Sequence, residues 1–442
     1  MDFVLIDYQP RDGQINRDQT GTFGSSFETG GWLGQRLARL KSRNVRLPVV
    51  SFSYANAVLR AHGHRVQVVT HDVPDAGGDV AIFATVMYHW QEDLAFLREY
   101  RRRHPSTRLG VIGGFSKTMP ELYAADVDFF INTDIEEAVY AFLQGRWEWQ
   151  GTFDGAGFAP PLDELPMPSW AGFPVERYAY RPALRRKPFL VMQSARGCSF
   201  NCTFCPYMVT QSTKIRHRTP QQLEAEIRYL HGDLGVRSIL FRDILFGVPK
   251  SHAESVADVF AALRYDIEWA METHINALSE PLIKRMTAAG LRVVNLGIES
   301  ADPETLGKSG KKPVHVERIE ETVALLHRYG VRVQAFYMLG LQADTPETMA
   351  ATIAFAKTLN TFSAQFCVTT PFPGTRFYEE VKDNLLHRDW SRFTEYEPVL
   401  QVPNVTPLQV RDARDTAYRT YYRRARWMLR HGPGVVRDLV HR

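Results

Sequence analysis

Three of the four cysteines in this chain of 442 residues fall within one short stretch. They are Cys198, Cys202 and Cys205, which follow Gly197 with the spacing C-x3-C-x2-C, while Cys367 lies far downstream. Thiolates crowded onto a glycine-led loop can converge on one metal centre. Structural zinc takes four protein ligands, and a 4Fe–4S cluster usually takes four thiolates. Three cysteines alone would hold a cluster with one iron open to a substrate or cofactor; the alternative is three thiols without a metal.

The composition excludes several classes of protein. Hydrophobic residues make up 44% and charged residues 23% of the sequence, which is typical of a globular and not a disordered chain. A net charge of +4 is too small for a strongly nucleic-acid-binding chain. The clustered cysteines exclude a disulfide scaffold and indicate a reducing compartment. The first residues predict a strand and not a signal peptide, and no apolar run approaches the roughly 18 residues of a membrane span. We expect a soluble, cytoplasmic protein of two or three domains.

Residues 1–150 alternate strand and helix signals after a long polar loop, Gln9 to about Leu47. This alternation predicts a Rossmann-like, doubly wound parallel sheet. Such sheets bind ligands beyond the carboxyl ends of their strands. No G-x-G-x-x-G motif follows a strand, which argues against a nicotinamide site. A pair of glycines there would let a large planar ring approach the backbone closely. The residues expected near a cofactor are Asp7, Thr85–Met87, Gly113, Gly114 and Thr133.

The next two segments predict a linker and a second α/β unit. Seven prolines interrupt residues 151–188, which we interpret as a linker along the surface. Strand and helix then alternate six times over 189–386. Because eight such units close a complete barrel, six predict a partial β/α barrel with a lateral gap and a site at the carboxyl ends of its strands. The strands are expected at 189–194, 238–242, 267–272, 291–296, 331–338 and 364–369.

Residues 387–442 predict a helical C-terminal tail, with one helix from about Thr406 to Arg430. Nine arginines and three aspartates lie within 411–442. Interleaved basic and aromatic residues can bind RNA or a membrane surface. The alternative is a helix whose aromatics pack on the barrel while its arginine stems cover the surface. The aromatic residues concerned are Tyr418, Tyr421, Tyr422 and Trp427.

The cysteine stretch, with Phe204 directly before the third cysteine, resembles the cluster loop of the radical S-adenosylmethionine (AdoMet) superfamily. Gly297-Ile298-Glu299-Ser300, with Lys312 downstream, resembles its GxES signature, and 371–375 resembles its PxPGT turn. The resemblance implies a 4Fe–4S cluster whose open iron binds AdoMet and whose electron generates a deoxyadenosyl radical. His274 stands where arginine is common, which leaves binding of the AdoMet carboxylate there open. The AdoMet contacts implied are Phe204, Tyr207, Asp243, His274, Glu299, Ser300 and Tyr337.

Residues 1–150 resemble the cobalamin-binding domain of one radical AdoMet subclass. The match lies in 59–66, in 112–115 and in Glu136-Glu137, and the linker segment 162–168 resembles that subclass's connector. The Asp-x-His-x-x-Gly loop is absent, which argues against a lower histidine ligand and not against cobalamin. The cobalamin contacts implied are Thr85, Gly113 and Gly114. A Rossmann-like domain without a corrin is the alternative.

Together these resemblances imply a cobalamin-dependent radical AdoMet methyltransferase acting on an unactivated carbon, or phosphorus, of a small metabolite. Its implied partners are the substrate and an electron donor such as flavodoxin or ferredoxin. The alternatives are a radical AdoMet enzyme of ring formation, rearrangement or oxidation, and a non-catalytic zinc- or RNA-binding protein. Methylthiolation of transfer RNA is disfavoured because residues 1–197 contain no cysteine. No residue stands out as a catalytic acid or base, so the catalytic residues stay unassigned.

Overall fold

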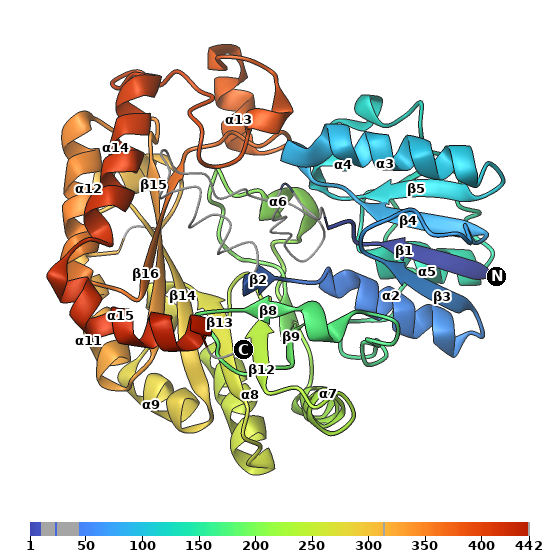
Figure 1. The fold of residues 1–442 in the computed structure, drawn as a ribbon, viewed down its shortest axis with the longest axis horizontal. Coiled ribbons are helices and arrows are strands. Elements are labelled where there is room, and N and C mark those ends of the chain that lie inside the picture. The colour runs from blue at the N-terminus through green and yellow to red at the C-terminus, as the bar shows by residue number, and fades with distance from the viewer. Residues whose placement is uncertain (10–22, 24–43, 313, 441–442) are drawn as a thin grey trace.

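The computed structural model describes residues 1–9, 23, 44–312 and 314–440. Two six-stranded sheets, each wholly parallel, dominate these residues and stand side by side (Figure 1). The expected fold class is confirmed: a doubly wound sheet, a six-unit partial barrel and a helical C-terminal region. Most of the expected polar loop after Gln9 lies outside the described residues.

The first sheet is covered by helices on both faces. Helices α2 (Val50–Ala61) and α5 (Ile135–Leu143) pack together on one face, while α3 (Trp90–Arg103) packs its apolar residues against the other. A strand covered on both faces is hydrophobic throughout, and all five residues of β4 are buried. The strand order is β3 (Arg65–Val69), β1 (Asp2–Ile6), β4 (Val80–Ala84), β5 (Arg108–Ile112), β6 (Phe129–Ile131) and β7 (Gly151–Phe153).

The segment interpreted as a surface linker contributes to the core. Strand β7 extends the first sheet into its opening residues. Further on, Asn56 Nδ2 donates to the backbone oxygens of Ser169 (2.9 Å) and Ala171 (3.0 Å), which ties the segment to α2. Strand β8 (Ala179–Tyr180) pairs with β2 (Val45–Arg46). The prolines correctly predicted an irregular backbone. They did not indicate that one side of the segment is apolar and packs inward. Its buried side chains include Leu162, Leu165, Trp170, Phe173, Tyr178 and Leu184.

The second sheet is the partial barrel. Its order is β16 (Ser363–Val368), β15 (Arg332–Leu339), β14 (Leu291–Glu299), β13 (Glu268–Thr273), β12 (Ser238–Phe241) and β9 (Phe189–Met192), so that its end strands are β16 and β9. Each of the six expected strands is found within a few residues of its predicted bounds. The outer helices are α7 (Pro220–Gly232), α8 (Lys250–Leu263), α9 (Glu280–Ala288), α11 (Val316–Arg328) and α12 (Pro346–Leu359).

The inner face of this sheet shows a regular alternation. Along β15 and β16 every second residue is only partly buried, while the residues between are buried against the helices. Successive strand side chains point to opposite faces, so the partly buried set faces the barrel interior. Apart from Arg332, these residues line an internal cavity: Gln334, Phe336, Met338, Ser363, Gln365 and Cys367.

The C-terminal region differs from its prediction in one respect. The single helix expected over 406–430 is wrong, because α14 (Pro407–Tyr421) and α15 (Ala425–Val440) are separate helices. The interleaved aromatics do pack inward. The hydroxyls of Tyr418 and Tyr422 accept hydrogen bonds from the backbone nitrogens of Phe366 and Ala364 on β16, each at 3.0 Å. In the described part of the chain, no helix is long and apolar enough to span a bilayer.

Shorter elements complete the described chain. They are the helical turns η1 (Met87–His89), η2 (Pro120–Leu122), η3 (Val175–Arg177), η4 (Ile275–Ala277), η5 (Lys382–Asn384) and η6 (Trp390–Arg392), the helices α4 (Gly114–Thr118), α6 (Tyr207–Thr210), α10 (Pro303–Lys308) and α13 (Arg376–Val381), and the paired strands β10 (Ala195–Arg196) and β11 (Arg216–His217).

Candidate functional site

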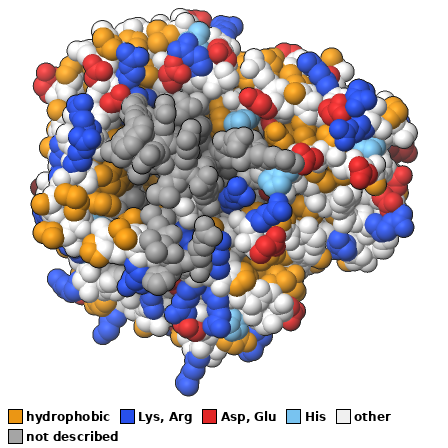
Figure 2. All heavy atoms as spheres, viewed as in Figure 1, with side chains coloured by type: hydrophobic (Ala, Val, Ile, Leu, Met, Phe, Trp, Pro, Cys, Tyr) orange, Lys and Arg blue, Asp and Glu red, His pale blue; other side chains and the backbone are white. Residues whose placement is uncertain are grey.

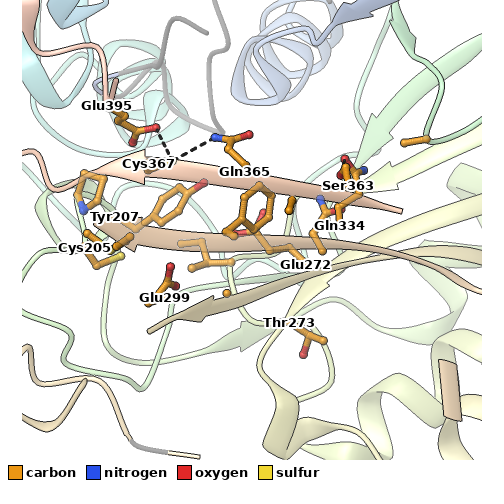
Figure 3. A pocket seen from close by; sticks show the side chains of 18 of the residues that line it. Cys205, Tyr207, Glu272, Thr273, Glu299, Gln334, Ser363, Gln365, Cys367 and Glu395 are labelled. Carbon is orange, nitrogen blue, oxygen red and sulfur yellow. Dashed lines mark hydrogen bonds between the residues drawn. The ribbon is translucent and has the colours of Figure 1, made fainter. Parts of the chain in front are cut away.

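A cavity of about 740 Å³ runs through the barrel interior (Figure 3). Its volume lies within the range of small-molecule and cofactor pockets. Cys198, Cys202 and Cys205 all line it, together with residues that follow β12, β13, β14 and β16. The three cysteines therefore share one cavity at the carboxyl ends of the strands, as the spacing and the barrel prediction required.

The start of the cysteine loop is fixed by a neighbouring strap of backbone. Cys198 N donates to Ser212 O at 3.1 Å, and Gly197 has φ of +100°. A Cβ at Gly197 would lie 2.4 Å from Lys214 O, which is closer than any side chain tolerates. Glycine is thus required here both by its backbone conformation and by the space available.

The far side of the loop rests on the turn after α10. Thr203 donates to Ser309 O from its backbone nitrogen (3.1 Å) and from Oγ1 (3.0 Å). Gly310, with φ of +71°, brings this turn so close that a Cβ would lie 3.0 Å from Asn201 O. Phe377 N in turn donates to Thr203 O at 3.0 Å. The loop is therefore held from both sides before any metal is considered.

The chemistry of the three thiols fits a cluster. Burial raises the pKa of Cys202 to about 11 and raises the pKa of Cys198 and Cys205 as well, so without a metal all three carry protons at neutral pH. Metal ligation would displace these protons, since the thiolate is the ligand. Among the described residues, no three His, Cys, Asp or Glu side chains are grouped to hold a single metal ion. In a 4Fe–4S cluster each thiolate would bind a different iron, so the three cysteines would be farther apart than the ligands of a single metal ion.

Glu299 forms an ion pair beside the cysteines. Lys311 Nζ donates to Glu299 Oε1 and to Gly297 O, each at 2.7 Å. Glu299 has a left-handed backbone, with φ of +65°, at a register shift between β14 and β15. A Cβ at Gly297 would lie 2.5 Å from Glu299 Oε1, so the glycine makes room for the pair. Our sequence comparison pointed to Lys312, which is exposed; the lysine that lines the cavity is Lys311.

His274 lines the cavity with a neutral imidazole ring. Burial, together with nearby Lys311, lowers the pKa of His274 to about 4, and the ring is neutral although the Lys312 backbone opposes this shift. Nδ1 accepts from Asn276 N at 3.2 Å, which places the proton on Nε2. Nε2 is buried and makes no hydrogen bond of normal geometry. A neutral histidine can therefore donate to a carboxylate where the family commonly uses arginine.

Phe204 and Tyr207 also line the cavity, but three other expected AdoMet residues do not. The Asp243 carboxylate accepts from Ser194 N at 2.7 Å, and burial raises its pKa to about 6. Ser300 Oγ lies 3.3 Å from Thr352 Oγ1 on α12. Tyr337 stacks on Phe366 inside the core, with ring centroids 5.2 Å apart. The structure gives all three a packing role, and their contact with AdoMet stays a prediction.

The expected cobalamin residues lie at the correct edge of the first sheet, outside the cavity lining. Thr85 Oγ1 is bonded within its own domain, to Ser116 Oγ at 3.1 Å. The approach to Gly114 is taken by Phe23, whose ring lies 2.9 Å from the position of a Cβ there. Phe23 itself lines the cavity and packs on Phe372, with ring centroids 5.0 Å apart. A corrin over Gly114 would therefore have to displace this ring.

Two other expected residues at this edge, Asp7 and Thr133, lie outside the cavity lining as well. Asp7 Oδ2 accepts from Val49 N at 3.4 Å, and Thr133 Oγ1 donates to Asp134 O at 3.3 Å. The first domain reaches the cavity through Leu47 and the neighbouring Asn44 and Val45, which sequence patterns did not single out.

Comparison with known proteins agrees with this geometry. The model of the radical SAM superfamily matches residues 192–356. The uncharacterized methyltransferase PH0819 of Pyrococcus horikoshii is 31% identical over 271 residues, which cover 61% of this chain and 58% of that protein. Cytidylyl-2-hydroxyethylphosphonate methyltransferase of Streptomyces wedmorensis is 24% identical over 264 residues, covering 56% and 49%. The chain spans about half the length of the curated relatives it matches.

Solved structures extend the likeness to the whole fold. The radical AdoMet methyltransferase TsrM of Kitasatospora setae, solved with cobalamin and a 4Fe–4S cluster, has a TM-score of 0.62 at 16% identity, covering 86% of this chain and 78% of its own. The cobalamin-dependent radical enzyme OxsB has a TM-score of 0.60 at 12% identity, covering 85% of this chain and 54% of its own. These likenesses concern the fold. The superfamily match shows a radical SAM domain over residues 192–356.

Proposed function

We propose that this protein is a radical AdoMet enzyme, and that it transfers a methyl group to a small substrate with the help of cobalamin. The observation that carries the proposal is the cysteine loop: three thiols, one buried and two partly buried, line the cavity of a partial barrel, and backbone contacts fix the loop on both sides. The methyltransferase relatives and the fold shared with two cobalamin enzymes support the second half of the proposal.

The side chains around the loop have separate tasks in this proposal. Cys198, Cys202 and Cys205 would hold the cluster. His274 Nε2 would donate a hydrogen bond to the AdoMet carboxylate, and Glu299 would accept from an ammonium or hydroxyl group of AdoMet while Lys311 balances its charge. When bound, the reduced cluster supplies the electron that cleaves AdoMet, and cobalamin supplies the methyl group.

The remainder of the cavity is the proposed substrate chamber. It continues past the cysteines to the inner faces of β15 and β16, which carry amide, hydroxyl, aromatic and sulfur-containing side chains. Tyr418, Tyr422 and Trp427 of the C-terminal region line it as well. These walls would exclude water from a reactive intermediate. An electron donor such as flavodoxin or ferredoxin, and a cytoplasmic location, belong to the same proposal.

Anaerobic reconstitution with iron and sulfide tests the first half of the proposal. We expect a brown protein with about four irons and four sulfides per chain, which converts AdoMet to 5′-deoxyadenosine when a reductant is added. A colourless protein that retains zinc and does not cleave AdoMet would contradict the radical assignment.

Cobalamin loading tests the second half. Incubation with hydroxocobalamin, followed by gel filtration, should leave about one cobalt per chain and a corrin absorption spectrum. A protein that cleaves AdoMet but retains no cobalt would keep the radical assignment and refute the methyltransferase. The reaction would then fall to the rival class of ring formation, rearrangement or oxidation, which two cyclases among the relatives represent.

A further inference from the structure

A buried group of charged side chains joins the two domains directly behind the cysteine loop. Arg196 lies two residues before Cys198, and its side chain is only 4% exposed. Its Nη2 donates to Glu136 Oε1 at 2.8 Å, and its Nη1 lies 3.4 Å from Asp134 Oδ2. Both acids belong to the amino-terminal end of α5 in the first domain. The cysteine loop is thus bonded to a helix of the other domain.

The same acids hold the other side of the loop. Arg216 on β11 is the register partner of Arg196 on β10, and its Nη2 donates to Asp134 Oδ2 at 3.1 Å. The two strands that enclose the cysteine loop therefore meet at one carboxylate. The Arg196 guanidinium also lies 4.7 Å from the centre of the Tyr54 ring on α2. Two helices of the first domain consequently restrict where Arg196 can lie.

Energetics favour a positioning role for this group over a purely stabilising one. A buried ion pair gains little net stability over a hydrophobic packing of the same shape, but removal of one partner leaves a desolvated charge and is strongly disruptive. Charge-assisted hydrogen bonds are also short and directional. Such a group defines a geometry, and here that geometry belongs to the cysteine loop.

We propose that Asp134 and Glu136 position the cysteine loop through Arg196, so that the docked first domain forms part of the cluster-binding unit. The inference deepens the proposed function, because it concerns the loop that would hold the cluster. The order of the loop can be measured without any metal, however, and failure of one proposal is therefore distinguishable from failure of the other.

The test is hydrogen exchange on the metal-free, full-length protein. In Glu136→Gln, exchange in peptides covering 197–206 should be at least about tenfold faster than in the wild type. Asp438→Asn is the matched control. Like Glu136, Asp438 is buried and pairs with an arginine, but this arginine is Arg332 (2.6 Å), which lies outside the cysteine loop. We expect Asp438→Asn to leave 197–206 unchanged even if the whole protein melts at a lower temperature.

Reconstitution gives a second readout. Glu136→Gln should bind less iron per chain, and the electron paramagnetic resonance of its reduced cluster should differ from that of the wild type; Glu136→Asp, which keeps the charge, should restore both in part. Unchanged exchange and spectra in Glu136→Gln, or equal changes in Asp438→Asn, would overturn the inference. If the wild type binds no cluster, the proposed function fails and hydrogen exchange alone decides the positioning role.

A second surface stands apart from this network, on the outer side of α15. Of the large hydrophobic side chains that are exposed in the described part of the chain, three lie on this one helix: Met428, Leu429 and Val436. Leu429 is 81% exposed, and Pro433 and Val436 follow it at helical spacing on the same face. In Figure 2 hydrophobic side chains gather on the left side at about mid-height, near the place of α15 in Figure 1.

Positive charge borders this apolar face. Arg423, Arg426 and Arg430 are exposed, and in the described part of the chain none of them pairs with an acidic side chain. The acid on the helix, Asp438, is buried and is neutralised by Arg332 and by Arg185. The outer side of α15 thus combines an apolar stripe with uncompensated arginines.

The inner side of the same helix faces the proposed substrate chamber. Trp427 and Val435 line the cavity, and Trp427 Nε1 donates to Phe362 O at 3.2 Å. Helix α15 is therefore a wall between the cavity and the exterior. A membrane or macromolecule that bound the outer side of α15 would therefore lie next to the proposed substrate chamber.

We propose that the outer side of α15 docks on an anionic lipid surface. An amphipathic helix with arginines beside an apolar stripe is the form of helix that lies in a membrane interface, and anionic lipids attract such basic segments. Binding of single-stranded RNA relies on exposed aromatic rings for base stacking. Here Tyr418, Tyr421, Tyr422 and Trp427 are packed inward, which disfavours RNA.

Vesicle co-sedimentation of the full chain tests this surface. Binding to vesicles of phosphatidylglycerol and phosphatidylcholine should exceed binding to pure phosphatidylcholine and should fall at high salt. Leu429→Glu should weaken it at least about tenfold. Leu408→Glu is the control, because Leu408 is exposed on α14, outside the patch. The proposal would be overturned if the protein bound no vesicles, if both variants weakened binding equally, or if the protein bound an RNA oligonucleotide and no vesicles. It would also be overturned if the protein bound no vesicles and formed a dimer that Leu429→Glu abolished.

Discussion

The two six-stranded sheets share a parallel topology but differ in what covers them. Strand β4 of the first sheet is buried at every position because helices cover both faces. Strands β15 and β16 of the barrel alternate, because helices cover one face and the cavity occupies the other. Parallel strands buried on both faces read as uninterrupted hydrophobic runs. The alternation in the barrel therefore identifies the face that is open to a ligand.

The largest expected effect separates a cysteine of the loop from the cysteine on β16. Cys205→Ala should reduce bound iron and AdoMet cleavage to background, because a cluster with two protein ligands is not held. Cys367→Ala should retain both, since Cys367 lies on β16, outside the C-x3-C-x2-C stretch, and its thiol contacts Gln365 (3.3 Å) and Glu395 (3.9 Å). Iron analysis of both reconstituted variants is the measurement. Equal iron loss in the two would mean that Cys367 is a fourth ligand.

Substitution of two glycines with positive φ, Gly197 in the cysteine loop and Gly63 in the first domain, compares the two regions directly. Gly197→Ala would place a Cβ 2.4 Å from Lys214 O, so we expect the cysteine loop to lose its conformation and the protein to lose its cluster. Gly63, with φ of +78°, has no atom within 4 Å of that position. Gly63→Ala should cost only the left-handed backbone, about 1–2 kcal/mol of unfolding free energy. Urea unfolding with iron analysis measures both, and cluster loss in Gly63→Ala would contradict this assignment.

Core and cavity positions should respond in opposite ways. Ile82→Ala on β4 removes a fully buried side chain and should lower the unfolding free energy by about 2–5 kcal/mol. Gln365→Ala on β16 alters a cavity-facing residue and should change stability by less than about 1 kcal/mol. Its effect should appear instead in substrate turnover. Chemical denaturation of both variants checks the pair, and a large stability loss in Gln365→Ala would show that its face is core.

The last expected effect concerns the pH dependence of stability and His327 of α11, whose ring lies near His431 of α15. Burial, assisted by Arg430, His431 and Arg426, lowers the pKa of His327 to about 4. The unfolded chain, with an ordinary histidine pKa near 6.5, binds the proton first. Stability should therefore be complete above pH 6.5 and fall towards pH 4, by about 2 kcal/mol at pH 5. His327→Gln should flatten this part of the curve; the urea midpoint at pH 7.5 and 5 is the measurement, and an unchanged slope would refute the assignment.

Periodicity and spacing predicted the larger part of the fold. The sequence predicted the six barrel strands, the Rossmann-like sheet and the position of the cysteine loop at the strand ends, because each depends on a local hydrophobic pattern or on adjacent residues. Lys311 was not predicted, since sequence spacing alone did not distinguish it from Lys312; the distinction depends on the turn at Gly310 and the shifted register of Glu299. Trp170 and Leu162 were hidden among prolines, and Phe23 over Gly114 depends on packing between distant segments.

The network around Arg196 shows a second limit. Glu136 was singled out for its likeness to a cobalamin-domain motif, whereas the structure gives it a partner in the other domain. No local pattern could reveal that contact, because it depends on how two separately legible units dock. Sequence reasoning pointed to the cysteine loop, whose role stays a prediction, and missed several of the residues that hold the loop in place.

The tyrosines of α14 have a consequence for how the molecule can be cut. Strand β16 ends the barrel sheet, and its outward backbone nitrogens are taken up by Tyr422 OH at Ala364, Tyr418 OH at Phe366 and Glu395 O at Val368. An uncovered strand of this kind is a template for pairing with other chains. A fragment trimmed after the barrel would therefore be expected to aggregate through β16, because it would lack Glu395 and the two tyrosines that cover this edge.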